Sequence, residues 1–547
     1  MLTPSDLDKA GDLVAASYTQ VEAEMLDYLV GRMISGNIAD QRSQTAILLL
    51  AQSATPELER ILDEHASEID RAVNDEVRTL LGESDERDLA YVKKGLGVEL
   101  DGITTQEMAA TVRGIEGILS RHNIGMVEGA KDAFIKASTD AVVNVNAGFM
   151  TTERALHKAV RDLEGKGISV IQYVSQSTGA KTVANQVDVA VRRHIRTQIA
   201  QDGARRTEQI MDEAGIEFVE VSSHTGARPS HQEWEGRVYS RNGRKKVGGH
   251  VYEDFRTACH VGDIADGIYG ANCRHSHGPY IPGMERTYKP NPEHPSGLSN
   301  DEVYSLSQKQ REKEREIRKT KRELSGAKQL YAANENDDNL AEVLRLQQKL
   351  RGEQADMRAL IDNANARCRP GTSVLQRSPR REWAGDMPKV TLSASAQTKQ
   401  RALAVADLKD RCVRKMYPIY SEDSFGTVTR RAWGKLSDDR YYTLAMHGTP
   451  ETVTLFGTKV DHKVVADIIT RRKDYDGTKA VRLLSCSTGD DSGDAPCFAQ
   501  RLADELGVQV VAPTDTVWVS TDGGLAVGKK RGDNTGSMKT FDPRPRS

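Results

Sequence analysis

The chain has 547 residues, and its 76 lysines and arginines nearly balance 79 aspartates and glutamates, so its formal net charge is −3. This length exceeds what one hydrophobic core supports and predicts three or four structural units, while the near-neutral charge identifies no class of partner. With 38% hydrophobic, 5% aromatic and 28% charged residues, the composition argues against one dense core and favours extended or solvated helices.

The cysteines and the apolar residues bear on where the protein resides. Six cysteines scattered along the chain form no disulfide framework, which indicates a reducing compartment. No apolar run reaches the roughly 18 residues of a membrane span, and the N-terminal sequence has no signal-peptide pattern. We therefore expect a soluble protein made in a cytoplasm, without a membrane partner.

The first 180 residues follow a helical pattern. Thr3-Pro4-Ser5-Asp6 supplies a capping hydroxyl, a proline at the first helical position and an acid in the first turn. Apolar residues then recur at helical spacing, which predicts one long helix ending near Gly36. A second helical stretch over 41–81 and charged helical segments over 88–180 follow. The sequence predicts a helical bundle over residues 1–180.

Residues 183–206 are predicted as a helix with an apolar stripe and basic surfaces. The stripe recurs at a spacing of four and comprises Val183, Val187, Val191, Ile195 and Ile199. The basic surfaces carry Arg192, Arg193, His194, Arg196, Arg205 and Arg206. Phosphate contacts need only positive charge within reach, so this helix suits DNA. It equally suits pairing with acidic residues of a partner protein or of neighbouring helices, and the pattern leaves these interpretations open.

Residues 221–283 concentrate ligand-type and turn-type residues in a compact knot. Six of the 13 histidines and two of the six cysteines lie here, namely His224, His231, His250, His260, His275, His277, Cys259 and Cys273. An alternating strand over 216–221 leads into the knot, and 238–240 with 250–252 predicts a hairpin. We expect a small α+β module over residues 181–298.

Three interpretations of the knot remain open. Its ligand types suit zinc, although no paired CxxC ends are present, and the zinc set would be Cys259, Cys273, His275 and His277, with His231 in place of Cys259 as a variant. Alternatively, no cofactor is required, and polar side chains fix the turns by hydrogen bonds and stacking around a small core; these are His224, Arg228, His231, Trp234 and Arg274. The third interpretation is a metal-dependent nuclease that uses His224, His231 and Arg228.

Residues 299–365 predict a helical hairpin. Ser299-Asn300-Asp301 is a helix cap, and 308–323 alternates basic residues with glutamates at offsets of three and four. A short heptad seam follows, formed by Val343, Leu346, Leu350, Met357 and Leu360. Residues 366–397 are basic, contain proline and lack periodicity, which predicts a linker.

Residues 398–547 change in character. Apolar strands over 441–446, 481–484 and 508–511 alternate with two amphipathic helical segments. This order is typical of a parallel α/β sheet, in which functional residues lie at the carboxyl ends of the strands. The chain is therefore predicted to be multidomain: a helical N-terminal part, an α+β module, a helical hairpin and a C-terminal α/β domain.

The knot carries the more specific of two family resemblances. The runs VSSHTGARPSHQEWEGRVYS and NCRHSHGPYIPG, preceded by the arginine-rich helix, closely resemble the phage minor capsid protein 2 family, which is related to head-morphogenesis proteins of the phage Mu type. The resemblance implies a structural minor head protein of a tailed phage or prophage, near the portal. Its partners would be portal and capsid proteins, and packaged DNA for helix 183–206. Its location would be the virion head, and the host cytoplasm during assembly or after injection.

The C-terminal domain resembles the caspase-like cysteine peptidases, including processing and toxin domains of bacterial effectors. Their pattern is an apolar strand followed by His-Gly and a later strand followed by Ala/Ser-Cys, matched here by His447-Gly448 and Ser485-Cys486. The resemblance implies that Cys486 is the nucleophile, that His447 moves its proton, and that the Gly448 amide helps to bind the oxyanion. The substrate would be a peptide or a host protein. The alternative is a purely structural virion protein with an inactive C-terminal domain.

Overall fold

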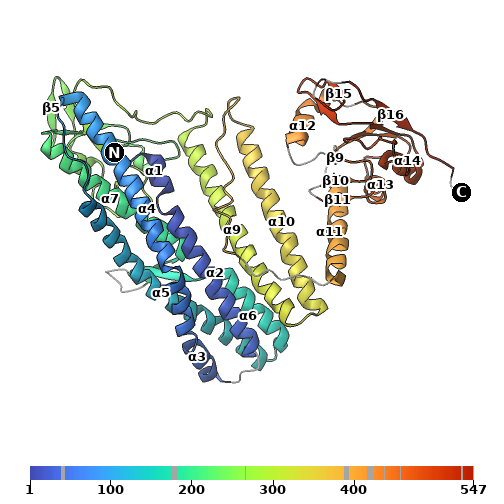
Figure 1. Ribbon diagram of the computed structural model, residues 1–547, viewed down its shortest axis with the longest axis horizontal. Helices are drawn as coiled ribbons and strands as arrows, with labels where there is room; N and C mark the ends of the chain where they lie inside the picture. The colour runs from blue at the N-terminus through green and yellow to red at the C-terminus, as the bar shows by residue number, and fades with distance from the viewer. Residues whose placement is uncertain are drawn as a thin grey trace. The chain divides into compact units, whose positions relative to one another are not determined.

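The computed structural model describes residues 1–38, 43–174, 181–264, 266–386, 394–414, 424–436, 438–455, 458–530, 532 and 534–545. It divides into two compact units, Met1–Val390 and Thr391–Ser547. Figure 1 follows the chain through both from blue to red. Among the described residues, no helix combines the length and apolar character that crossing a membrane requires.

The first unit is mostly helical. Its helices are α1 (Pro4–Lys9), α2 (Asp12–Ser35), α3 (Gln44–Gln52), α4 (Thr55–Leu96), α5 (Thr105–Asn146), α6 (Thr152–Lys166), α7 (Val187–Glu213), α8 (Phe255–Ala258), α9 (Asn300–Ala333) and α10 (Asp337–Asn365). Helix α2 contacts α4, α5, α6, α7 and α9, and its apolar side chains lie in the main core. The helical N-terminal part is therefore confirmed.

The prediction of one continuous helix up to Gly36 is wrong, because the chain breaks at Gly11. Gly11 has a φ of 83°, which lies in the left-handed region. A side chain there would meet the Cα of Arg192 at 2.8 Å, so the chain approaches α7 closely. The Glu76 carboxylate accepts hydrogen bonds from the backbone N–H groups of Gly11 and Leu13, at 2.7 and 2.8 Å, and so caps α2.

A strand pair interrupts the segment that was predicted to be helical. Strands β1 (Ser169–Val174) and β2 (Lys181–Gln186) pair antiparallel. Gly167, with a φ of 65°, ends α6, and the following letters SVIQYV are rich in β-branched and aromatic residues that favour strands. The helix predicted from residue 183 consequently begins at Val187, and residues 183–186 belong to β2.

Helices α9 and α10 form the predicted hairpin and lie side by side in Figure 1. The hairpin packs on the bundle through α6 and α2. At this contact the guanidinium of Arg322 lies 3.7 Å from the carboxylate of Glu22, and both side chains are buried. Glu22 also accepts the backbone N–H of Ile168 at 2.7 Å. The hairpin therefore shares a unit with the bundle.

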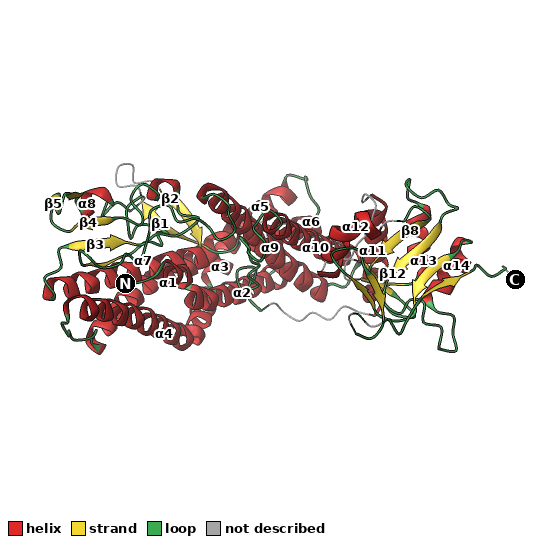
Figure 2. Ribbon diagram, turned by 90° about the horizontal axis from the view of Figure 1, so that it is seen from above, coloured by secondary structure: helices red, strands yellow, loops and turns green. Residues whose placement is uncertain are grey.

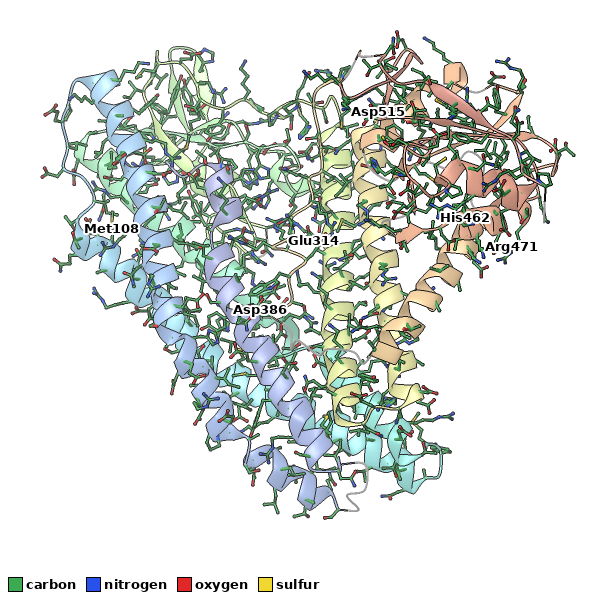
Figure 3. The ribbon with its side chains drawn as sticks, turned by 45° about the vertical axis from the view of Figure 1, so that its right-hand side comes forward. Met108, Glu314, Asp386, His462, Arg471 and Asp515 are labelled. Atoms are coloured by element: carbon green, nitrogen blue, oxygen red, sulfur yellow. The ribbon has the colours of Figure 1, made fainter. Side chains whose placement is uncertain are left out.

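Part of the predicted linker, residues 366–386, packs against the same unit. Glu382 and Ala384 are buried, and Arg377 binds Glu382 at 2.6–2.7 Å. The backbone N–H of Asp386 donates to Gln20 of α2 at 2.7 Å, and Figure 3 labels Asp386 at this place. We call residues 366–386 the strap. Residues 387–393 of the predicted linker lie outside the described residues.

The second unit contains an α/β sheet with strand order β16-β13-β12-β8. Its strands are β8 (Tyr441–Ala445), β12 (Ala480–Leu484), β13 (Val510–Pro513) and β16 (Met538–Phe541). The first three are parallel, as the sequence predicted, and β16 is antiparallel. Helices α13 (His462–Thr470) and α14 (Phe498–Leu506) connect them and pack together, as Figure 2 shows beside β8 and β12.

Further helices and strands of this unit surround the sheet. They are α11 (Ala394–Arg414), α12 (Ser424–Leu436), β9 (His447–Gly448), β10 (Val453–Leu455), β11 (Thr458–Val460), β14 (Val517–Val519) and β15 (Leu525–Val527). Leu444 and Leu483 point into the core with α13 and α14. Ala445 and Leu484, one position further along each strand, join a second cluster with α12. Both faces of the sheet are therefore covered, and its strand ends remain to form a site.

Candidate functional site

The knot is organised by a small antiparallel sheet. Strand β3 (Phe218–Val221) pairs with β4 (Val238–Ser240) on one side and β7 (His277–Tyr280) on the other. A separate hairpin joins β5 (Lys245–Val247) to β6 (His250–Tyr252), so the hairpin predicted between 238–240 and 250–252 is wrong in its partners. The two loops that leave β3 and enter β7 meet beside α7, and they carry the ligand-type side chains.

Three of these side chains form a candidate metal site. His231, Cys273 and His275 are buried, and their ligand atoms all lie within 4.8 Å of one another. The Nδ1 atoms of the two histidines are 3.3 Å apart. The Cys273 Sγ lies 3.7 Å from Nδ1 of His275 and 4.0 Å from Nδ1 of His231. Around a tetrahedral zinc ion, neighbouring nitrogen and sulfur ligands are roughly 3.3–3.6 Å apart, so the three residues fit such an ion with small adjustments.

Glu235 fixes the orientation of one of these ligands. Its Oε2 lies 2.8 Å from Nε2 of His275, which leaves Nδ1 of that ring facing the other two ligand atoms. A carboxylate on the outer nitrogen of a ligating histidine is a recurrent feature of metal sites. The Nε2 of His231 and the Oε1 of Glu235 are buried without a hydrogen-bond partner among the described residues. No spacing in the sequence indicated Glu235, because its partner His275 lies forty positions away along the chain.

The structure separates the other predicted ligands from this cluster. His277 turns the other way, where its ring contacts the hydroxyl of Tyr269 and its Nε2 lies 3.2 Å from Glu208. Cys259 is buried, and burial raises the pKa of its thiol. The predicted set of Cys259, Cys273, His275 and His277 is therefore divided, and His231 takes its place beside Cys273 and His275.

The residues predicted to fix the turns surround the cluster. The Trp234 ring lies 4.5 Å from the His231 ring and 4.8 Å from the His275 ring, between centroids, and His224 stacks on His275 at 4.6 Å. Arg228 donates to the carbonyl of Ala271 at 3.0 Å, and Arg274 donates to that of Gly226 at 3.4 Å. These contacts join the loop after β3 to the loop before β7.

The arginines of α7 have partners within the chain. Arg192 binds Asp12 at 2.7 Å, and Arg206 binds Asp85 at 2.7 Å. Arg196 is buried and donates to the carbonyl of Asp8 at 2.9 Å, whereas Arg205 pairs with Asp202 and is largely exposed. Arg192, Arg205 and Arg206 therefore pair with acidic residues of the same chain, and Arg196 binds a backbone carbonyl. The DNA interpretation stays a prediction.

The second candidate site lies at the strand ends of the second unit. Strands β8 and β12 are in parallel register with Leu484 opposite Ala445, and the N–H of Met446 donates to the carbonyl of Leu484 at 3.2 Å. His447 follows Ala445 by two residues, and Cys486 follows Leu484 by two. His447 begins β9, which pairs antiparallel with β10 in a separate sheet. His447 and Cys486 therefore each follow the carboxyl end of one of two neighbouring parallel strands.

Close backbone packing supports this juxtaposition. A side chain at Gly448 would meet the Oγ of Ser485 at 2.8 Å and the carbonyl oxygen of Cys486 at 3.0 Å. Ser485 donates to the carbonyl of Met446 at 2.7 Å, which ties the two strand ends together. Cys486 is half-buried, and the exposed His447 ring lies 5.6 Å from the Phe425 ring between centroids.

The loop after Cys486 is held on the neighbouring strand. Ser487 has a φ of 53°, and its N–H donates to the carbonyl of Asp515 at 3.0 Å. The N–H of Gly489 donates to the carbonyl of Pro513 at 2.9 Å. A sharp turn directly after a strand-end cysteine presents its side chain at the edge of the sheet. Cys497, by contrast, is buried, and burial raises the pKa of its thiol.

Two family models match the chain. The model described as phage minor capsid protein 2 matches residues 2–362, which is more than half of the chain. A model described as a domain of unknown function, DUF8616, matches residues 422–527. Neither the curated proteins nor the solved structures contain a match.

The buried carboxyl of Glu235 makes the stability of the fold depend on pH. Burial raises the pKa of its carboxyl to about 7, against roughly 4.3 in an unfolded chain. Its contribution to stability is therefore complete below about pH 4 and is lost as pH rises through 7, and the loss is at most on the order of 4 kcal/mol. Burial lowers the pKa of His224 and of His231 to about 4, which has the opposite slope.

Because these slopes oppose each other, the quantity to measure is the difference in the free energy of unfolding between Glu235→Gln and the natural chain. Chemical denaturation of the metal-free full chain between pH 5 and 8 should show that Glu235→Gln gains stability relative to the natural chain as pH rises. Glu233→Gln, at an exposed neighbouring position, is the matched control and should leave the pH profile unchanged. Parallel profiles for Glu235→Gln and the natural chain would contradict the assignment.

Proposed function

Because the chain belongs to the phage minor capsid protein 2 family and is thus a structural protein of the phage head, we propose that it lies next to the portal and carries a cysteine-peptidase-like domain at its C-terminal end. The position rests on the family resemblance of the first unit. The domain rests on the second unit, where the DUF8616 match assigns no activity.

The register of β8 and β12 carries the proposal for the C-terminal domain. It aligns Ala445 with Leu484, and both strands end two residues before a chemically competent side chain, His447 or Cys486. A cysteine nucleophile requires a base within hydrogen-bond reach and an accessible thiol. Half-burial of Cys486 and exposure of His447 satisfy the second condition. The alternative of an inactive domain makes no demand on either residue.

The proposed reaction is peptide-bond cleavage. His447 accepts the proton of the Cys486 thiol, and the thiolate attacks the peptide carbonyl carbon. The tetrahedral oxyanion is bound by the backbone N–H groups of Gly448 and Cys486. The proton then passes from His447 to the leaving amine, and water hydrolyses the thioester to regenerate the thiol. The absence of a side chain at Gly448 keeps the histidine strand against the cysteine loop.

We also propose that His231, Cys273 and His275 hold a zinc ion. The observation that favours it is the set of three buried ligand atoms with Glu235 behind one of them. A zinc ion there would supply a cross-link between the loop after β3 and the loop before β7, and so add folding free energy. The nuclease interpretation of residues 221–283 stays a prediction.

The position in the head predicts contacts with the portal. In purified virions treated with a lysine-reactive cross-linker, mass spectrometry should detect cross-links from this chain to portal subunits. Copies in solution, treated in the same way, provide the background of self-links. Cross-links confined to the major capsid protein would contradict a position next to the portal.

The proposed zinc site predicts that zinc binding requires Cys273 and not Cys259. Elemental analysis of the purified full chain should find about one zinc per chain, lost in Cys273→Ser and retained in Cys259→Ser. Both cysteines are buried, so the second variant controls for the loss of a buried thiol. Chelation should lower the melting temperature of the natural chain and of Cys259→Ser alone. Equal zinc contents in the two variants would rule out the proposed ligand set.

The peptidase proposal predicts labelling at one thiol. Full-length chain treated with an acyloxymethyl ketone peptide probe should be labelled at Cys486, and Cys486→Ala or His447→Gln should lose the label. Cys497→Ala, which removes a buried thiol of the same unit, should keep it. Absence of both labelling and self-cleavage in a chain whose second unit is folded would favour the inactive-domain alternative.

A further inference from the structure

Arginines from four separate segments surround one cavity in the first unit. The cavity has a volume of about 350 Å³ and lies between α7, α9, the knot loops and the strap. Its arginines are Arg192 and Arg196 on α7, Arg228 and Arg274 in the knot, Arg311, Arg315 and Arg318 on α9, and Arg381 in the strap. Among the described residues, two acidic side chains line it, Asp8 and Glu314, and Figure 3 labels Glu314 on α9.

The nearby carboxylates do not balance these arginines. Asp8 faces Arg274 and Arg381, and Asp188 lies between Arg192 and Arg318. Asp12 and Asp266 pair with Arg192 and Arg228 from outside the lining. Together with Glu314 these are five acids for eight guanidinium groups, so the part of the chain that the structure describes gives the cavity an excess of three positive charges.

Arg311 is a half-buried arginine of this lining without a direct partner among the described residues. Its guanidinium makes neither a hydrogen bond nor an ion pair with any of them. Burial lowers its pKa, and the positive charges of Arg274 and Arg381 lower it further. Burial also raises the pKa of Glu314, which weakens the nearest compensating charge on the same helix. An anion in the cavity would relieve this repulsion.

We propose that the cavity binds a compact polyphosphate anion, with two or three linked phosphate groups, either free or as the phosphate chain of a nucleotide. Guanidinium groups match phosphate oxygens with paired N–H donors, and here they approach from several directions. The excess of three positive charges matches the charge of such an anion. The volume is at the small end of ligand sites, and it admits a short phosphate chain but not the width of a DNA duplex.

The site is independent of the proposed peptidase and adds a ligand to the structural role of the first unit. His231, Cys273 and His275 line the same cavity, so a metal ion could contribute to anion binding. The inference rests on the arginines alone. A chelator in the binding experiment removes any metal ion, so binding that persists is due to the arginines.

Isothermal titration calorimetry on the full-length chain in EDTA tests the inference with inorganic tripolyphosphate, ATP and a 20-base-pair duplex as separate probes. Tripolyphosphate should bind, and Arg311→Gln should weaken it by about tenfold or more. Lys309→Gln makes the same change of charge on the same helix at an exposed position outside the lining, and should bind as the natural chain does. Arg315→Gln is a second test, and thermal melts verify that each variant is folded.

Comparison of the three probes also identifies the source of the phosphate groups. Binding of tripolyphosphate and ATP with equal sensitivity to Arg311→Gln supports a phosphate-chain site, and tighter binding of ATP assigns it to a nucleotide. The inference is overturned if tripolyphosphate does not bind, or if Arg311→Gln and Lys309→Gln weaken it equally. It is also overturned if only the duplex binds and tripolyphosphate does not displace it, because that result describes an extended DNA surface.

Discussion

The Asp8 carboxylate is the interaction on which the first unit's functional region depends. One oxygen lies 3.2 Å from Arg274 of the knot, and the other lies 3.3 Å from Arg381 of the strap. Burial raises the pKa of Asp8, but Arg274, Arg381 and Arg196 together bring it below the ordinary value, so the group stays ionised. Asp8 is half-buried, and a carboxylate withdrawn from water to this degree is stabilised by such partners. The N-terminal helix, the knot and the strap therefore meet at one charge.

Further bonds from the first two residues fix the knot on the helices. Ser276, in the loop before β7, donates to the carbonyl of Leu2, and the terminal amine of Met1 pairs with Asp88 of α4. Asp88 in turn accepts a hydrogen bond from Thr207 of α7 at 2.6 Å. The N-terminus thus bonds to the knot and to α4, and α4 bonds to α7. This arrangement explains why the irregular loops around Cys273 hold a defined geometry without regular secondary structure.

Local patterns in the sequence predicted those parts of the fold that depend on neighbours in the chain. The parallel strands β8, β12 and β13 follow from apolar runs separated by amphipathic helices, and the α9–α10 hairpin follows from its caps and charge spacing. The break at Gly11 was missed because its cause is the approach of Arg192, far along the chain. His277 was assigned to the metal site together with Cys273 and His275. Alternate positions share a face only within a strand, and β7 begins at His277, so His275 in the preceding loop points elsewhere.

The cysteines of the two candidate sites differ in their burial. Cys273 is buried, and burial raises the pKa of its thiol, so it would lose its proton readily only to a metal ion. Cys486 lies half-buried directly after β12, and its loop packs closely against Gly448, the residue after His447. Cys259 and Cys497 are buried like Cys273, but neither belongs to the cluster of ligand side chains, and such burial suits inert packing. The sequence placed Cys259 and Cys273 together as ligand candidates, whereas the structure places only Cys273 in the cluster with His231 and His275.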